Sequence, residues 1–158
     1  MISLIQSIVK LVVNHKMFYH LSEECHDKET FVPKKMDRNR VMEHENWWTK
    51  RICVSDSIDG AISALMTYDT TPFGKHLFVH IPENIDDLMS KNKIVKPTLK
   101  QVPDADATGE HWLKAPTKMR CIGELEILNV TDEQIEFDHN GSAGFVDRFT
   151  WKWIWQKS

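Results

Sequence analysis

The alternating segment FVDRFTWKWIWQ, at residues 145–156, constrains the fold more than any other part of the sequence. Its large aromatic residues recur at every second position, at Phe149, Trp151, Trp153 and Trp155. Successive side chains of a β-strand point to opposite faces of a sheet, so this spacing predicts a final strand with one buried aromatic face. Such a strand needs partner strands and a core that covers its apolar face. The fold must therefore contain a β-sheet.

Several other segments have the composition of strands, with β-branched or aromatic residues bounded by polar or turn-forming ones. These segments are KMFYHLS (16–22), RICVS (51–55), HLFVHIP (76–82), RCIGELEILNV (120–130) and DEQIEFDHNG (132–141), the last being a strand followed by a turn. Pro82 is expected to end the strand at 76–82, because proline cannot donate a hydrogen bond to a neighbouring strand.

One helix is expected directly after the strand at 51–55, over the segment IDGAISALMTY at 58–68. Asp56 or Ser57 can cap its first turn, because a short side-chain oxygen accepts a hydrogen bond from the free N–H groups there. Its apolar residues recur at the spacing of one helical face, at Ile58, Ile62 and Leu65.

Two long segments between these elements are expected to be mostly loop. Residues 23–50 are highly charged and contain Pro33, and residues 83–119 are interrupted by prolines and carry one short strand. A loop of this length in a small domain is usually functional or mobile. The elements together predict a compact α+β domain in which several strands surround one or two helices.

The length of 158 residues suits one domain, 1–158, with a core of its own. We expect residues 17–158 to form the body of that domain and residues 1–16 to form an N-terminal amphipathic helix or an extension. The apolar stretch of 1–16 is short, is interrupted by polar residues and lacks a small-residue cleavage site. It therefore predicts neither a membrane span nor a secretion signal.

The charge and the cysteines narrow the functional classes. A net charge of −3 argues against non-specific nucleic-acid binding, which needs a basic face. The three cysteines, Cys25, Cys53 and Cys121, lie far apart and form no CxxC pair, which argues against a disulfide framework and a structural zinc site. We expect them to be reduced, in a cytoplasmic protein.

Three polar clusters flank or interrupt the expected strands: Tyr19–Ser22, Arg51–Ser57, and a loop with Asp104, Asp106 and Glu110. A helix N-terminus after a serine-bearing strand favours phosphate, and a nearby arginine can add a bidentate contact. A carboxylate held over a sugar can stabilise a developing oxocarbenium ion, and a histidine can hydrogen-bond a ribose hydroxyl. Together these groups suit the cleavage of an N-glycosidic bond in a nucleotide.

Each of these residues also has a structural interpretation. Taken alone, His20 is more often a partly buried histidine that satisfies backbone groups. Ser55 and Ser57 are more often helix caps than ligand-binding residues. Asp104 and Asp106 are most simply part of a solvated turn.

A metal site near the N-terminus is a further interpretation. His15, His20, Cys25 and His26 offer imidazole and thiolate groups, which suit zinc. Their spacing matches no tight ligand pair, and the adjacency of Cys25 and His26 is awkward for a tetrahedral site. We therefore expect no metal among the site residues.

The order of the clusters resembles that of the ADP-ribosyltransferase superfamily, and most of all the small rifamycin-modifying ADP-ribosyltransferases of bacteria. The segments that carry the resemblance are YHLS, RICVSDSIDGAISAL, LFVHIP, the loop rich in proline and aspartate, and EHWLKAPTKMRCIGELEI. The resemblance covers roughly residues 17 to 128, and its motifs are short. It implies a split, strongly bent β-sheet that grips NAD⁺ in a cleft.

The resemblance also implies roles for single residues. His20 matches the family histidine that binds ribose hydroxyls of NAD⁺, and Ser22 takes the place of the small hydroxyl residue in the same motif. The family tyrosine that stacks on nicotinamide falls on Cys53, which is a departure from the family pattern. Ser55 is the expected substitute, because many members of the superfamily use a serine motif near this position. The expected NAD⁺-binding residues are thus His20, Ser22, Arg51, Cys53, Ser55 and Ser57.

The third family position is an acidic residue that orients the ribose and stabilises the oxocarbenium-like transition state. Asp104, Asp106 and Glu110 compete for this catalytic role. Trp112 follows Glu110 closely at a strand entry. In other branches the catalytic glutamate is often followed in the same way, and this favours Glu110. The aspartate of the rifamycin-modifying branch would instead fall nearer Asp104.

The resemblance implies an NAD-dependent ADP-ribosyltransferase, bacterial or from a phage, that transfers ADP-ribose to an unknown acceptor: a protein, a nucleic acid or a small molecule. The segment 23–50 is the expected place of target selection, where Trp47 and Trp48 are either a stacking surface or a loop anchor. Two alternatives stay open. One is an NAD hydrolase, with water as acceptor. The other, supported by the missing tyrosine, is a non-catalytic nucleotide- or protein-binding inhibitor of phage or plasmid type on the same scaffold.

Overall fold

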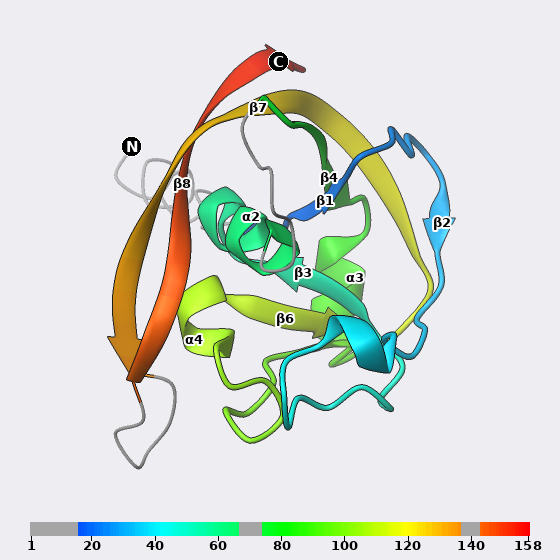
Figure 1. The fold of residues 1–158 in the computed structure, drawn as a ribbon. Helices are drawn as coiled ribbons and strands as arrows, with labels where there is room; N and C mark the ends of the chain where they lie inside the picture. Colours follow the sequence, from blue (N-terminus) through cyan, green and yellow to red (C-terminus); the bar gives the residue numbers. More distant parts are fainter. Residues whose placement is uncertain (1–15, 67–73, 137–142) are drawn as a thin grey trace, which may run out of the picture.

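The protein is represented by a computed structural model, which describes residues 16–66, 74–136 and 143–158 (Figure 1). Its strands are β1 (His20–Ser22), β2 (Thr30–Phe31), β3 (Ile52–Ser55), β4 (His76–Pro82), β5 (Ile94–Val95), β6 (Glu110–Leu113), β7 (Thr117–Glu136) and β8 (Ala143–Gln156). Its helices are α2 (Ile58–Met66), α3 (Ile85–Ser90), α4 (Ala105–Thr108) and the 3₁₀ helix η1 (Arg38–Arg40). The expectation of an α+β fold is confirmed, with mostly antiparallel strands and few helices.

The strands form two sheets that are joined by an isolated bridge. The larger sheet has the order β1-β4-β7-β2, with β8 paired to β7, and the smaller one has the order β3-β6-β5. At the bridge, Tyr19 N–H donates to Ser55 O at 2.8 Å and Ser55 N–H donates to Tyr19 O at 2.9 Å. Figure 1 shows β7 curving over the domain toward its long pairing with β8, and α2 lying beside these strands.

The apolar residues form separate clusters on the two sheets. The first cluster packs α2 against the larger sheet and consists of Leu21, Ala61, Ile62, Leu77, Val79, Leu125, Ile127 and Phe149. The second packs the smaller sheet against α3 and consists of Phe18, Ile52, Val54, Leu88 and Leu113. β1 and β3 therefore contribute to different clusters, β1 through Leu21 and β3 through Ile52 and Val54.

Several expected elements are confirmed. β4 matches the expected strand at both ends, and the helix expected at 58–68 is α2 as far as the described residues reach. Ser57 caps this helix, because Gly60 N–H donates to its Oγ at 3.0 Å. The strands expected at 120–130 and 132–141 form one continuous strand, β7, up to Glu136. The helix expected at 1–16 lies almost wholly outside the described residues.

Two expectations are wrong in part. The segment 83–119 holds more than one short strand, since α3, β5, α4 and β6 all lie within it. All four residues of β6 are buried, so this strand shows no alternation by which a pattern could find it. The aromatic face of β8 is also not buried throughout: Phe149 is buried, but Trp155 is 37% exposed. Register shifts in the pairing of β7 with β8 interrupt the strict alternation.

None of the helices in the described ranges is both long and apolar enough to cross a membrane.

Candidate functional site

A pocket of about 210 Å³ opens between the two sheets. Its walls come from β1, β3, α2, α4, β6 and the segment 36–45. The pocket lies beside the bridge between Tyr19 and Ser55, which joins the two sheets. Both residues of the bridge line the pocket.

The charged groups of the pocket are mostly acidic. The carboxyl groups belong to Glu45, Asp104 and Glu110, whereas Arg40 supplies the single lysine or arginine among its described lining residues. The rest of the lining is largely apolar, with Leu21, Met36, Val41, Met42, Val54, Ala61, Ala64 and Leu65. This lining suits a ligand that places positive charge near the carboxyl groups and an anionic group near Arg40.

His20 lies on β1 and lines the pocket. Its Nδ1 lies 2.9 Å from the carbonyl oxygen of Cys53 on β3. A carbonyl only accepts hydrogen bonds, so Nδ1 carries the proton. Burial lowers the pKa of His20, an effect opposed by this hydrogen bond and strengthened by His26. The neutral ring therefore keeps a lone pair on Nε2, which can accept a hydrogen bond from a ligand hydroxyl.

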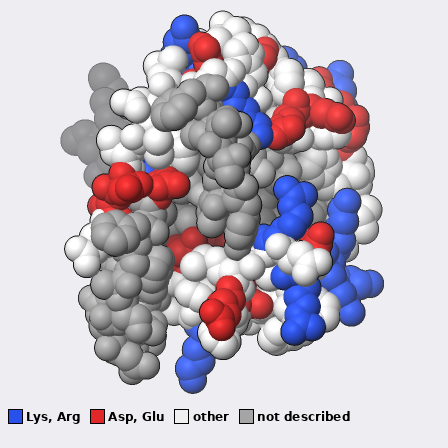
Figure 2. Space-filling model, in the orientation of Figure 1, with Lys and Arg blue, Asp and Glu red and all other residues white. Residues whose placement is uncertain are grey.

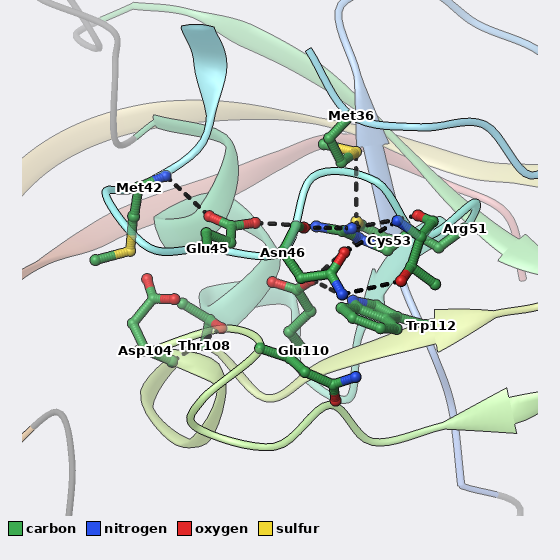
Figure 3. Close-up of polar contacts among 12 residues, drawn as sticks. Met36, Met42, Glu45, Asn46, Arg51, Cys53, Asp104, Thr108, Glu110 and Trp112 are labelled. Atoms are coloured by element: carbon green, nitrogen blue, oxygen red, sulfur yellow. Dashed lines mark hydrogen bonds and ion pairs between the residues drawn. The ribbon is translucent and has the colours of Figure 1, made fainter. Parts of the chain in front are cut away.

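Glu110 is the first residue of β6 and is 8% exposed. Its Oε1 accepts a hydrogen bond of 2.7 Å from Trp112 Nε1 and lies 4.0 Å from Arg51 Nε (Figure 3). Burial raises the pKa of Glu110 to about 7, helped by the neighbouring Glu45 and Asp104 and opposed by Trp112 and Arg51. The group is thus poised to exist in both protonation states near neutral pH.

Glu45 and Asp104 complete the acidic cluster around the pocket. Glu45 Oε1 lies 3.0 Å from Arg51 Nη2, and its Oε2 accepts from Met42 N–H at 3.0 Å. Burial raises the pKa of Glu45 in spite of this ion pair, and burial also raises the pKa of Asp104. Glu45 and Glu110 share one buried guanidinium, and Asp104 repels both of them, which makes it costly for all three carboxyl groups to be ionised together.

Arg51 is expected to bind phosphate, but the structure places its side chain behind the pocket, fully buried. Its guanidinium donates to Asn46 O at 2.6 Å and lies 4.4 Å from the centre of the Trp112 ring (Figure 3). It also pairs with Glu45 and approaches Glu110. Arg51 therefore acts as the internal counter-charge of the acidic cluster.

Cys53 lines the pocket at the position of the family tyrosine. Its sulfur accepts a hydrogen bond from Arg51 Nε at 3.4 Å and lies 3.9 Å from Met36 Sδ. Burial raises the pKa of the Cys53 thiol to about 12, with a further contribution from Glu110. The thiol stays protonated near neutral pH, so Cys53 is neither a nucleophile nor a stacking group.

Ser55 also lines the pocket, but its hydroxyl is already used. It donates to Thr108 O at 2.5 Å and accepts from Ser57 N–H at 3.2 Å. Ser55 thereby ties β3 to the end of α4, and no proton of its hydroxyl remains for a ligand.

The remaining expected site residues lie outside the pocket lining. Ser22 accepts a hydrogen bond from Glu24 N–H, and Ser57 caps α2. Asp106 is exposed and forms an ion pair with Lys96 at 2.9 Å. The structure thus gathers His20, Cys53, Ser55, Asp104 and Glu110 in one pocket.

No sequence pattern predicts the contribution of the segment 36–45, which supplies Met36, Arg40, Met42 and Glu45 to the pocket. The length of the loop 23–50 indicates that the loop is functional. No residue spacing within it shows which side chains turn toward the pocket. Figure 2 shows basic side chains gathered around the part of this loop that holds η1. Trp48 is 57% exposed beside Trp47, and neither lines the pocket.

The arrangement can bind a hydroxylated ligand through His20 and stabilise positive charge through Glu110. No family model, curated protein or solved structure matches the chain.

Proposed function

We propose that the chain is an NAD⁺-dependent ADP-ribosyltransferase that cleaves the bond between nicotinamide and ribose. The observation that carries the proposal is the meeting of His20 and Glu110 in one pocket, although they lie on strands of different sheets. The resemblance assigns a ribose-binding histidine and a catalytic acidic residue to these two positions. The division of the strands into two sheets around the pocket also supports the split sheet that the resemblance implies.

In the proposed complex, His20 holds the ribose. Its Nδ1–H is fixed by the carbonyl of Cys53, so Nε2 faces the ligand as an acceptor for a ribose hydroxyl. The hydrogen bond to β3 also fixes the orientation of the ring before the ligand binds, so less side-chain entropy is lost on binding.

Glu110 acts on the reacting carbon. As nicotinamide departs, positive charge develops on the ribose, and an ionised carboxylate beside it stabilises the transition state. Burial raises the pKa of Glu110, because its negative charge loses its hydration and is only partly compensated by Trp112 and Arg51. A cationic nicotinamide ring or an oxocarbenium ion would supply that compensation, so the pocket favours the ionised carboxylate most in the presence of substrate.

The size and charge of the pocket indicate which part of the dinucleotide enters it. At about 210 Å³, it is smaller than the roughly 300–1,000 Å³ of most ligand sites and suits the nicotinamide riboside half of NAD⁺. Tyr19 and the apolar side chains of α2 offer a surface for the nicotinamide ring. The exposed Arg40 is placed to contact the diphosphate that links this half to the adenosine.

A second candidate is a non-catalytic module that binds NAD⁺ or a protein. It is favoured by Cys53, whose buried thiol replaces a stacking ring. The hydrolase alternative uses the same pocket and differs only in the acceptor.

The test is an analysis of products by mass spectrometry after incubation of the purified chain with NAD⁺, with and without cell lysate. A transferase releases nicotinamide and leaves ADP-ribose on a component of the lysate. A hydrolase releases nicotinamide and free ADP-ribose without lysate. Binding of NAD⁺ in calorimetry without any release of nicotinamide identifies the binding module, and absence of both binding and release overturns the NAD⁺ site altogether.

A further inference from the structure

A second cluster of reactive side chains lies apart from the pocket and is not used by the proposed reaction. Cys25, His80 and Cys121 each place a potential ligand atom within 4.8 Å of the other two. His80 on β4 and Cys121 on β7 are register partners across the two strands, and both are fully buried. Cys25 is exposed, in the segment between β1 and β2. The fold thus brings three soft or borderline ligands together from three separate segments.

The ring of His80 has an unusual hydrogen-bonding state. Its Nε2 accepts from the backbone N–H of His26 at 3.0 Å, but its buried Nδ1 has no hydrogen-bond partner. Buried polar groups in proteins are almost always paired, so such an atom indicates a missing partner.

We propose that Cys25, Cys121 and His80 bind a zinc-class cation through two thiolates and one imidazole nitrogen. Thiolate and imidazole are the ligands that zinc prefers, with Zn–S distances of about 2.3 Å and Zn–N distances of about 2.0–2.1 Å. Tetrahedral ligands at these lengths lie roughly 3.5–3.8 Å from one another. The cluster therefore needs to contract by at most about 1.3 Å, and the exposed Cys25 is the member that is free of core packing.

Binding changes the protonation of all three ligands. Each thiol releases its proton to solvent and binds as a thiolate. With the ion on the idle Nδ1, the ring proton moves to Nε2, and the hydrogen bond from His26 N–H is given up. The fourth position belongs to water or to a ligand from outside the chain, as at zinc sites with three protein ligands.

The expected consequence is structural. The ion would fasten the segment after β1 to β4 and β7, directly behind the His20 ring, whose centroid lies 6.3 Å from that of His80. Asp27 already fastens the same segment by accepting from Cys121 N–H at 2.9 Å. The inference does not depend on NAD⁺ chemistry, because none of its three ligands lines the pocket.

The test is a titration of the full chain with Co²⁺, a spectroscopic substitute for Zn²⁺, under anaerobic conditions and with a phosphine reductant. We expect one equivalent of Co²⁺ to give thiolate-to-metal charge transfer and the visible bands of a tetrahedral site, and Zn²⁺ to bleach both. Cys25→Ser should lose these bands without unfolding, because Cys25 is exposed. Cys53→Ser is the matched control, since Cys53 lies outside the cluster and should leave the bands unchanged.

Two results would overturn the proposal. The first is a reduced, folded chain that gives no charge-transfer band with Co²⁺. This result would overturn the proposal even if Cys25 and Cys121 can be oxidised to a disulfide. The second is a set of bands that survives Cys25→Ser and is lost in Cys53→Ser. The thermal unfolding temperature provides a second readout. Zn²⁺ should raise it in the parent chain and leave it unchanged in Cys25→Ser.

Discussion

Trp112 Nε1 donates a hydrogen bond of 2.7 Å to the carboxylate of Glu110, two residues earlier on the same strand. The bond orients the carboxylate but does not neutralise it, and burial dominates its titration. The pocket thus contains an acidic group that is held in place by an uncharged donor and lacks a full counter-charge. This relationship leads to predictions about both stability and activity.

Glu110 should lower the stability of the fold as the pH rises. Its pKa is about 7 in the folded chain against an ordinary value of 4.5, so the folded state binds the proton more tightly than the unfolded state does. The stabilisation by the protonated form is present below pH 4.5 and is lost as the pH passes through about 7. Glu110→Gln keeps the acceptor for Trp112 and removes the titration. The unfolding free energy of this variant, relative to the parent, should rise by up to about 3 kcal/mol between pH 5 and pH 8, as measured by urea denaturation. A constant difference between the two proteins would contradict the account.

The same titration should appear in the turnover of NAD⁺. The ionised carboxylate stabilises positive charge, so kcat/KM for nicotinamide release should rise with pH as the Glu110 carboxyl, with its pKa of about 7, loses its proton. The measurement is a pH series of initial rates on the parent chain. A rate that falls with pH across this range would assign the catalytic role to the protonated form.

His20 should contribute through one ring nitrogen only. His20→Asn can still donate to the Cys53 carbonyl from its amide but has no acceptor at the position of Nε2. We expect it to weaken NAD⁺ binding about as much as His20→Ala does, by roughly 1–3 kcal/mol in calorimetry, since the ribose hydroxyl loses its partner. His20→Gln, whose longer side chain reaches the position of Nε2, should recover part of the loss. Full binding by His20→Asn would show that the ring only supports the backbone of β3.

Arg51 should matter for stability rather than as a ligand-binding group. Arg51→Met leaves Glu45 and Glu110 buried without their cation, and loss of one partner from a buried ion pair typically costs about 3–5 kcal/mol. The loss should be larger at pH 8 than at pH 6, because protonation of the carboxyl groups relieves it. Arg51→Lys should not restore the parent stability, since the flat guanidinium contacts the Trp112 ring and several acceptors at once.

The matched variant for Arg51 is Arg40→Met. Arg40 is exposed at the edge of the pocket, so its removal should leave the urea midpoint nearly unchanged. It should instead weaken NAD⁺ more than nicotinamide riboside, which has no diphosphate. Equal losses for both ligands would place the diphosphate elsewhere.

Gly60→Ala tests how closely α2 must approach the site. Alanine normally favours a helix over glycine by about 1 kcal/mol. Here a Cβ atom on Gly60 would lie 1.9 Å from the carbonyl oxygen of Thr108. We therefore expect a net destabilisation of about 1–3 kcal/mol in urea denaturation. A stabilised variant would show that α2 and the end of α4 are not in contact.

Much of the fold could be predicted from the sequence because local patterns determine it. The bounds of β4 follow from a run of β-branched and apolar residues that ends at Pro82, and α2 follows from its apolar spacing and its Ser57 cap. β6 could not be found in this way, since its buried Glu110 and His111 break the link between polarity and exposure. Glu110 lines the pocket, whereas the ring of the buried His111 lies 2.9 Å from Gly109 O and packs against Phe18.

The candidate site was only partly predictable, for a similar reason. His20 lies in a segment with the composition of a strand, whereas Glu110 is indicated only by its order along the chain. Glu45 lies in a charged loop, and only its pairing with Arg51 in the fold turns it toward the pocket. Cys25 and Cys121 are separated by most of the domain, so no spacing rule could bring them together.

The most direct test of the central claim is the rate of nicotinamide release from NAD⁺ by the parent chain, by Glu110→Gln and by Asp106→Asn. Asp106 is a carboxylate four residues before Glu110 that lies outside the pocket, so its variant controls for a change of charge. We expect release by the parent, a loss of about 10²-fold or more in Glu110→Gln, and a rate close to that of the parent in Asp106→Asn. Release that is unchanged in Glu110→Gln, or no release by the parent, would contradict the claim.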